Sequence, residues 1–95
     1  MDGFSIKVTM KDGFQKTYPL SSKVIVGLEF KYGKGFGELM GQMRHEHHCW
    51  MAWSSLHEDG VTVKPFNAPN QPGFLDDIED AELLTDKSFE STETP

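Results

Sequence analysis

Residues 4–19 read "FSIKVTMKDGFQKTYP" and set the architecture that we expect of the whole chain. Apolar and polar residues alternate along this stretch, and Asp12-Gly13 stands in its middle, where a two-residue turn needs positive φ. We therefore predict a β-hairpin over residues 4–19, with Pro19 closing the second strand. The alternation places Phe4, Ile6, Val8 and Met10 on one face, and Lys7, Thr9 and Lys11 on the other.

The segment that follows, "KVIVGLEFKYG" at residues 23–33, fits two structures. Strict alternation and β-branched residues favour a strand. A helix would instead be capped by Ser21 or Ser22 and ended by Gly33, although Gly27 inside the run argues weakly against it. Its inner face would hold Ile25, Leu28 and Tyr32. For the fold as a whole we take the helix, over about residues 22–33.

A long central helix is predicted over residues 38–58, ending at Asp59-Gly60, where glycine supplies a left-handed stop. A helix that is apolar around most of its circumference is covered on more than one side, and in so small a chain part of that cover would come from another molecule. Glu46 falls on the apolar side, so its carboxylate needs a hydrogen-bond donor in its own chain or across an interface. At about 100° per residue, that side holds Leu39, Met43, Trp50 and Trp53.

The C-terminal part divides into three segments. Residues 61–73 contain three prolines and form an irregular connector. "FLDDIEDAELL" then predicts a short amphipathic helix over residues 74–82. Residues 85–95 are rich in Ser, Thr and Glu, which predicts a disordered acidic tail. We therefore expect an α+β fold, with one globular domain at residues 1–84.

Composition limits the classes of function. The 95 residues suit one small domain, and a single cysteine forms no internal disulfide. No apolar run approaches a membrane span and no secretory leader is recognisable, so we expect a soluble cytoplasmic protein. Residues 74–95 carry eight acids and one base, a charge of −7, whereas residues 1–73 carry seven acids and eight bases, a charge of +1. This distribution argues against nucleic acid as a partner.

The histidine-rich stretch "RHEHHC" at residues 44–49 raises the possibility of a metal or catalytic site. His45 and Cys49 have helical ligand spacing, but the string fails the H-E-x-x-H pattern and lacks further ligands, so histidines on a helix rim are the better interpretation. Cys49 adjoins Trp50 in the most apolar part of the chain, where a buried small residue is expected rather than a nucleophile. We expect no enzyme activity, metal or cofactor.

Four motifs in order give this sequence a resemblance to a known family. They are Glu29 to Tyr32, the Glu-His and Trp-x-Ala-Trp pattern of residues 46–53, Pro65-Phe66, and Phe74 to Asp80. Together they resemble the short tail assembly chaperones of long-tailed bacteriophages, especially those of actinobacterial hosts. The chain departs from the family pattern where Phe74 stands in place of the usual tryptophan, behind the insertion "NAPNQPG".

The resemblance implies a binding protein that acts in the host cytoplasm and is absent from the finished virion. Such chaperones coat and solubilise the tape measure protein, and help to recruit tail tube subunits, mainly through a longer form made by ribosomal frameshifting. The acidic tail would keep coated filaments apart by repulsion. We expect a homo-oligomer whose partner-binding surface includes Glu46 as an orienting residue. The other predicted partner-binding residues are Phe36, Leu39, Met43, Trp50, Trp53, Phe66 and Phe74.

Two other classes of function stay open at this point. A small acidic phage-encoded inhibitor would use the −7 segment to bind a basic surface of a host protein, in a salt-sensitive way. A small metal-binding protein would use His45 and Cys49 and would melt at a different temperature with zinc.

Overall fold

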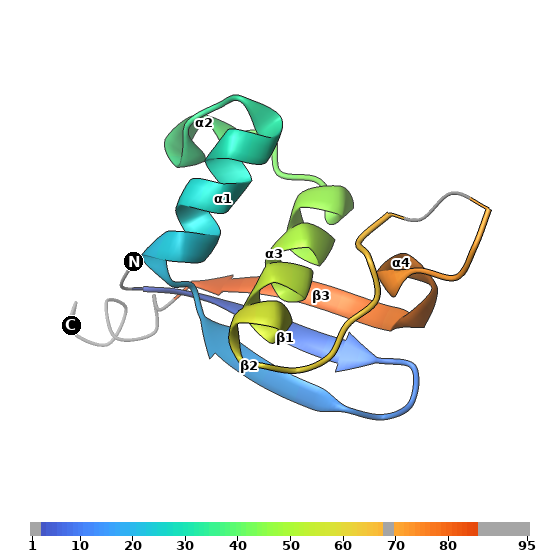
Figure 1. Cartoon of the computed structure of the whole chain (residues 1–95). Helices are drawn as coiled ribbons and strands as arrows, with labels where there is room; N and C mark the ends of the chain where they lie inside the picture. Colours follow the sequence, from blue (N-terminus) through green and yellow to red (C-terminus); the bar gives the residue numbers. More distant parts are fainter. Residues whose placement is uncertain (1–2, 68–69, 86–95) are drawn as a thin grey trace, which may run out of the picture.

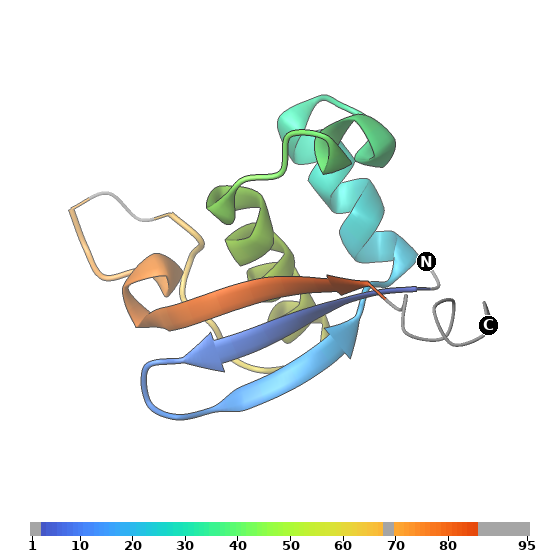
Figure 2. The same ribbon diagram turned by 180° about the vertical axis from the view of Figure 1, so that it is seen from behind.

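The computed structural model describes residues 3–67 and 70–85. In these ranges the chain forms β1 (Phe4–Met10), β2 (Gln15–Pro19), α1 (Ser22–Tyr32), α2 (Phe36–Met40), α3 (His45–Glu58), α4 (Phe74–Asp77) and β3 (Ile78–Thr85). The strands form an antiparallel sheet in the order β2-β1-β3. The helices α1, α2 and α3 lie on one side of this sheet (Figures 1 and 2). The predicted α+β class is confirmed, while the predicted tail lies, except for Thr85, outside the described residues.

The N-terminal hairpin forms as predicted, with a slightly longer turn. The Met10 N–H donates to the Phe14 carbonyl at 2.8 Å, which leaves a loop of three residues, 11–13, rather than two. Gly13 has a φ of 101°, which only glycine adopts easily, and the Asp12 carboxylate accepts the Phe14 N–H at 2.9 Å. On β1, Ile6 and Val8 are fully buried against the helices, as the alternation predicted.

Residues 22–32 form a helix, and both predicted signals mark its ends. The Ser21 hydroxyl accepts the Val24 N–H at 3.2 Å as an N-cap, and Gly33 ends the helix with a left-handed φ of 68°. The helix buries Val24, Ile25 and Leu28 and leaves its other side open. Burial of this stripe therefore outweighs the strand propensity of the β-branched residues.

The predicted continuous helix over residues 38–58 is wrong, because the chain forms two helices there. The short α2 ends at Met40, and α3 begins at His45 after Arg44, whose backbone is extended. Gly41 follows α2 directly, and glycine stabilises a helix interior poorly. The break means that Leu39 and Met43 do not continue the face that carries Trp50 and Trp53. The predicted stop at the other end is confirmed, since Gly60 has a φ of 83°.

The predicted helix over residues 74–82 is also wrong. Only one turn, α4, is helical, and residues 78–85 form the third strand of the sheet. This strand pairs with β1 in the register Ile6↔Leu83 and Val8↔Ala81. The long-range hydrogen bonds to β1, together with burial of Ile78 and Ala81, outweigh the helix propensity of "DAELL".

Candidate functional site

The motif residues that suggested the family come together where α1, α3 and the connector at residues 61–73 meet. Glu29 in α1 accepts the Phe36 N–H at 2.7 Å, which fixes the start of α2 relative to α1. Tyr32 in the last turn of α1 donates its hydroxyl hydrogen to Glu46 of α3 at 3.1 Å. Burial is the main cause that raises the pKa of the Tyr32 hydroxyl, and this hydrogen bond is the second. Two of the four motifs are thus linked by side-chain contacts.

His47 is buried in the same region and has a structural role. Its Nδ1 accepts the Arg44 N–H at 2.9 Å, which satisfies the exposed backbone at the start of α3. Its ring meets the Tyr32 ring edge to face, with centroids 4.4 Å apart. Burial lowers the pKa of His47 below its usual range, so the neutral imidazole is the favoured form.

We define the aromatic cluster as Trp50, Trp53, Phe66 and Phe74. Ring centroids lie 6.1 Å apart between the tryptophans, 6.1 Å between Trp53 and Phe66, and 6.5 Å between the phenylalanines. The indole N–H of Trp53 donates to the Lys64 carbonyl at 2.8 Å. The cluster therefore fastens residues 64–66 of the connector onto α3.

Gly27 in α1 supplies the space into which Trp50 packs. A methyl group added at Gly27 would lie 2.8 Å from Cη2 of the Trp50 ring, closer than van der Waals contact allows. The glycine that argued against a helix in the sequence is thus present for packing. It allows α1 and α3 to approach each other closely.

Replacing Gly27 by alanine should lower the free energy of unfolding by about 1 kcal/mol, because an overpacking cost of roughly 1–3 kcal/mol exceeds the helix-propensity gain of about 1 kcal/mol. Gly37→Ala is the matched control, because a methyl group there meets nothing within 4 Å. The control should be neutral or stabilising, and Trp50→Phe should suppress the Gly27→Ala defect. Urea denaturation of the wild type, the three single variants and the Gly27→Ala/Trp50→Phe double variant measures this. Equal shifts for the two glycine variants would contradict the close packing.

The predicted partner-binding residues divide into three groups. Phe36, Leu39 and Phe74 are at most 6% exposed and belong to the core of the free protein, so they are not available to a partner. Glu46 is exposed rather than surrounded by apolar side chains, and its donor is Tyr32 of the same chain. The remaining four are partly buried at the edge of the core: Met43, Trp50, Trp53 and Phe66.

His45 and Cys49 share one side of α3, as their spacing predicted, with Nε2 and Sγ 3.3 Å apart. Cys49 is only 1% exposed, and burial raises the pKa of its thiol to about 11. A protonated, inaccessible thiol is a poor nucleophile and a poor metal ligand. Within residues 3–67 and 70–85, no three side chains of His, Cys, Asp or Glu gather into a group that could hold a metal ion.

One apolar surface was not identified from the sequence. Val26 and Phe30 of α1 are 52% and 84% exposed, and they lie one helical turn apart. A hollow of about 320 Å³ lies beside them and is bounded by the glycine-rich turn after the helix. We call this surface the α1 patch: Val26, Glu29, Phe30, Gly33, Lys34 and Gly35. In the sequence, the signal for this surface was a second apolar stripe on the helix 22–33, formed by Val26 and Phe30 four residues apart.

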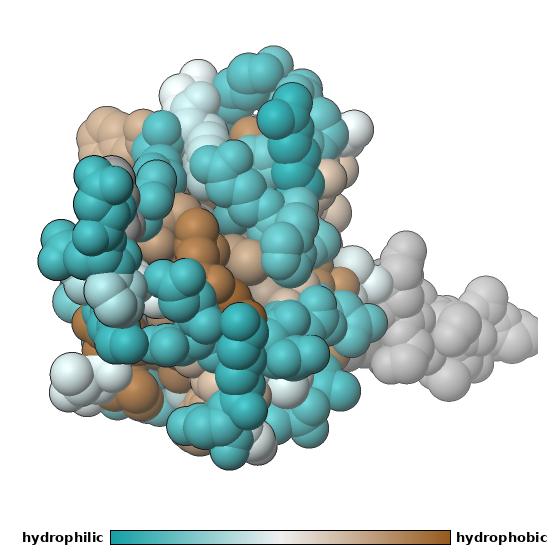
Figure 3. Space-filling model, turned by 90° about the vertical axis from the view of Figure 1, so that its right-hand side faces the viewer, coloured by the Kyte–Doolittle hydropathy of each residue, from teal (hydrophilic) through white to brown (hydrophobic). Residues whose placement is uncertain are grey.

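A larger cleft, of about 630 Å³, opens at the end of the sheet that carries the hairpin turn. Its apolar lining includes Met10, Phe14 and Val61, and none of the predicted partner-binding residues contributes to it. Figure 3 looks at this end of the molecule and shows apolar surface in a hollow rimmed by hydrophilic residues. The sequence offered no signal for it, because its walls come from three distant segments.

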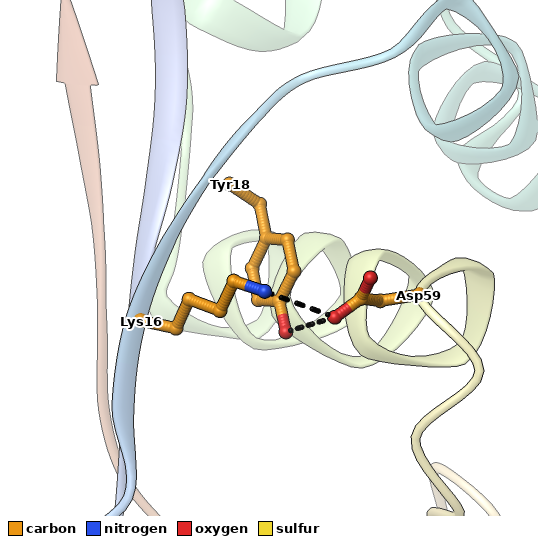
Figure 4. A network of polar contacts seen from close by, with 3 residues as sticks. All are labelled: Lys16, Tyr18 and Asp59. Atoms are coloured by element: carbon orange, nitrogen blue, oxygen red, sulfur yellow. Dashed lines mark hydrogen bonds and ion pairs between the residues drawn. The ribbon is translucent and has the colours of Figure 1, made fainter.

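A polar network ties the sheet to the end of α3 (Figure 4). Asp59, the C-cap of α3, accepts hydrogen bonds from Lys16 Nζ at 3.2 Å and from the Tyr18 hydroxyl at 3.0 Å. The hydrogen bond from Lys16 and, next in importance, the one from Tyr18 hold the pKa of the Asp59 carboxyl group below its usual range. Burial, followed by the hydrogen bond to Asp59, raises the pKa of Tyr18 to about 12.

The raised pKa of Tyr18 predicts a loss of stability in alkali. Because the folded state holds the hydroxyl proton more tightly than the unfolded chain, this contribution is fully present below pH 10 and is lost as the pH rises from 10.0 to about 12. Urea midpoints across that range should fall less steeply in Tyr18→Phe than in the wild type, and the raised pKa values of Tyr32 and Cys49 contribute to the remaining decline. An identical decline in both proteins would contradict the coupling.

Comparison of the chain with protein-family models, curated proteins and solved structures found no match. In the part of the chain that the structure describes, no helix is both long enough and apolar enough to cross a membrane.

Proposed function

We propose that this protein is a tail assembly chaperone of a long-tailed bacteriophage, which binds and solubilises the tape measure protein and helps to recruit tail tube subunits. One structural observation supports the proposal in addition to the order of the motifs. Residues from all four motifs contact one another at the junction of α1, α3 and the connector, through the Tyr32–Glu46 hydrogen bond and the aromatic cluster. Motifs that form one contact network support a shared architecture more strongly than motifs scattered over a surface.

The partner-binding surface in this proposal is apolar and lies beside that network. It combines the α1 patch with the partly buried edge of the aromatic cluster at Trp50, Trp53 and Phe66. The two parts are adjacent, because Trp50 packs on Gly27 and the Lys31 ammonium lies 5.6 Å from the Phe66 ring centroid. Phe30, as an exposed aromatic side chain, supplies the contact that a partner can bury most fully.

A binding role also agrees with the state of the reactive side chains. The thiol of Cys49 is buried and protonated, and His47 is neutral and bonded to backbone. Cys49 and His47, which suggested a catalytic or metal site in the sequence, thus have structural roles. We therefore propose a protein that works by binding, in the host cytoplasm during assembly and not in the finished virion.

Coexpression with a tape measure fragment from the same genome tests the proposal. The wild-type chain should keep the fragment in the soluble fraction. Phe30→Ser should lose most of this effect without unfolding the domain, because the side chain is 84% exposed. Phe14→Ser is the matched control, since Phe14 is also an exposed aromatic residue, at 40%, but lies at the hairpin turn. A fragment that stays insoluble with the wild-type chain would refute the proposal.

A second candidate is an acidic inhibitor of a host protein. Four acids on α4 and β3 are exposed, whereas Lys64 pairs with their neighbour Asp77 at 3.1 Å. This surface would bind a basic partner and lose affinity steeply with salt. Capture of a basic host protein at low salt, together with a failure to solubilise the tape measure fragment, would favour this candidate. The exposed acids are Asp76, Glu79, Asp80 and Glu82.

A further inference from the structure

The start of α3 depends on one nitrogen atom of His47. The Arg44 N–H lies 2.9 Å from His47 Nδ1, and the Arg44 carbonyl accepts the His47 N–H at 3.0 Å. Because a backbone N–H can only donate, Nδ1 carries no proton and the neutral ring holds its proton on Nε2. His47 therefore takes the place of the glutamate or glutamine that reaches back to the N-cap residue in a capping box.

The same ring holds the start of α3 against the end of α1. Tyr32 meets the His47 ring edge to face, with centroids 4.4 Å apart, and donates its hydroxyl hydrogen to Glu46 at 3.1 Å. Both partners of Tyr32 lie in the first turn of α3, so this junction requires that the turn stays helical. Trp50 lies one turn further along α3 and packs on Gly27 of α1. The first turn thus also supports the edge of the aromatic cluster that faces α1.

A protonated His47 cannot keep these contacts. Protonation puts a hydrogen on Nδ1, so the ring and the Arg44 N–H become two donors that face each other. His47 is also only 7% exposed, so a charged imidazole there loses hydration. Among the charged groups of the described residues that act on this ring, Arg44 and Lys34 oppose protonation and Glu46 favours it. The other titratable groups beside the ring are Tyr32 and His48.

We propose that His47 is an acid-sensitive switch, whose protonation opens the first turn of α3 and releases it from the end of α1. In the opened turn the imidazole is exposed and its pKa returns to the ordinary value of 6.5, whereas burial in the closed turn holds the pKa lower. Below pH 6.5 the opened turn is therefore favoured by up to about tenfold per pH unit, until the closed turn also takes up the proton. The junction is held closed near neutral pH and is loosened in acid.

Amide hydrogen exchange of the full chain tests the switch without any partner. Between pH 7 and pH 5, the protection factor of the Arg44 amide in the wild type should fall by about tenfold. His47→Gln should keep this protection nearly constant, because a glutamine oxygen accepts the Arg44 N–H and does not titrate. His48→Gln is the matched control, since it removes the neighbouring, half-buried imidazole and should leave the response of Arg44 as in the wild type.

Nitrogen chemical shifts of the His47 ring give a second measurement, which needs no variant to fold. At pH 7 we expect Nε2 to carry the proton, and we expect the ring to titrate below pH 6.5. A proton on Nδ1, or a ring that titrates at or above pH 6.5, would overturn the proposal. So would an Arg44 response that persists in His47→Gln or disappears in His48→Gln. Since no tape measure fragment is present, failure here leaves the proposed function untouched.

Discussion

Replacing Phe74 by alanine is expected to lower the free energy of unfolding by about 3–5 kcal/mol. Phe74 is 1% exposed and packs on Phe66, and its N–H donates to the Pro65 carbonyl at 2.9 Å. Removing the ring leaves a cavity where α4 and the connector join the core. A domain of this size has only about 5–15 kcal/mol of stability, so the loss should be visible as a large fall in the urea midpoint and melting temperature.

Leu75→Ala is the matched control, since the neighbouring side chain is 43% exposed. It should change the free energy of unfolding by about 0.5 kcal/mol or less. The pair separates a core role for Phe74 from the partner-binding role that the sequence suggested. If Phe74→Ala kept full stability and only partner binding fell, the placement of Phe74 in the core would be wrong.

Replacing Ala81 by aspartate should have a similar or larger effect. Ala81 is 3% exposed on the inner face of β3, opposite Val8 of β1, so a carboxylate there would be buried without a partner. An uncompensated buried charge costs roughly 3–5 kcal/mol, and we expect most of the protein to be unfolded or aggregated at neutral pH. Circular dichroism and urea denaturation measure the loss.

Thr85→Asp adds the same carboxylate to the same strand at an exposed position, and it should leave the stability nearly unchanged. Lowering the pH should partly rescue Ala81→Asp, because the neutral acid is less costly to bury than the carboxylate. Equal stability of the two variants would show that β3 does not cover the core as described.

The fold could be predicted from the sequence wherever local signals decide it. The Asp12-Gly13 turn and the alternation around it fix the hairpin, and Ser21 and Gly33 fix the ends of α1. The strand at residues 78–85 was missed because it depends on pairing with β1, some 70 residues earlier in the chain. Its local composition favours a helix, and hydrogen bonds to β1 together with burial of Ile78 and Ala81 reverse that preference.

The candidate site was less accessible to sequence reasoning. A helical wheel drawn through residues 38–58 assumed one straight helix, so the break before His45 misplaced Leu39 relative to the tryptophans. Glu46 keeps its helical spacing to Trp50 and Trp53, but it is exposed in the first turn of α3. The wheel also had no means of separating aromatic residues that fill the core, such as Phe74, from those at its edge, such as Trp53. Exposure of Phe30 becomes visible only once α3 is seen to pack on the other side of α1.

The measurement that tests the proposed function most directly is light scattering behind a sizing column, on the chain alone and coexpressed with a tape measure fragment. We expect the fragment to coelute with the chain at a mass that corresponds to several copies per fragment, and Phe30→Ser to reduce that number. A wild-type chain that elutes without the fragment, while the fragment remains insoluble, would contradict the chaperone and favour the acidic inhibitor.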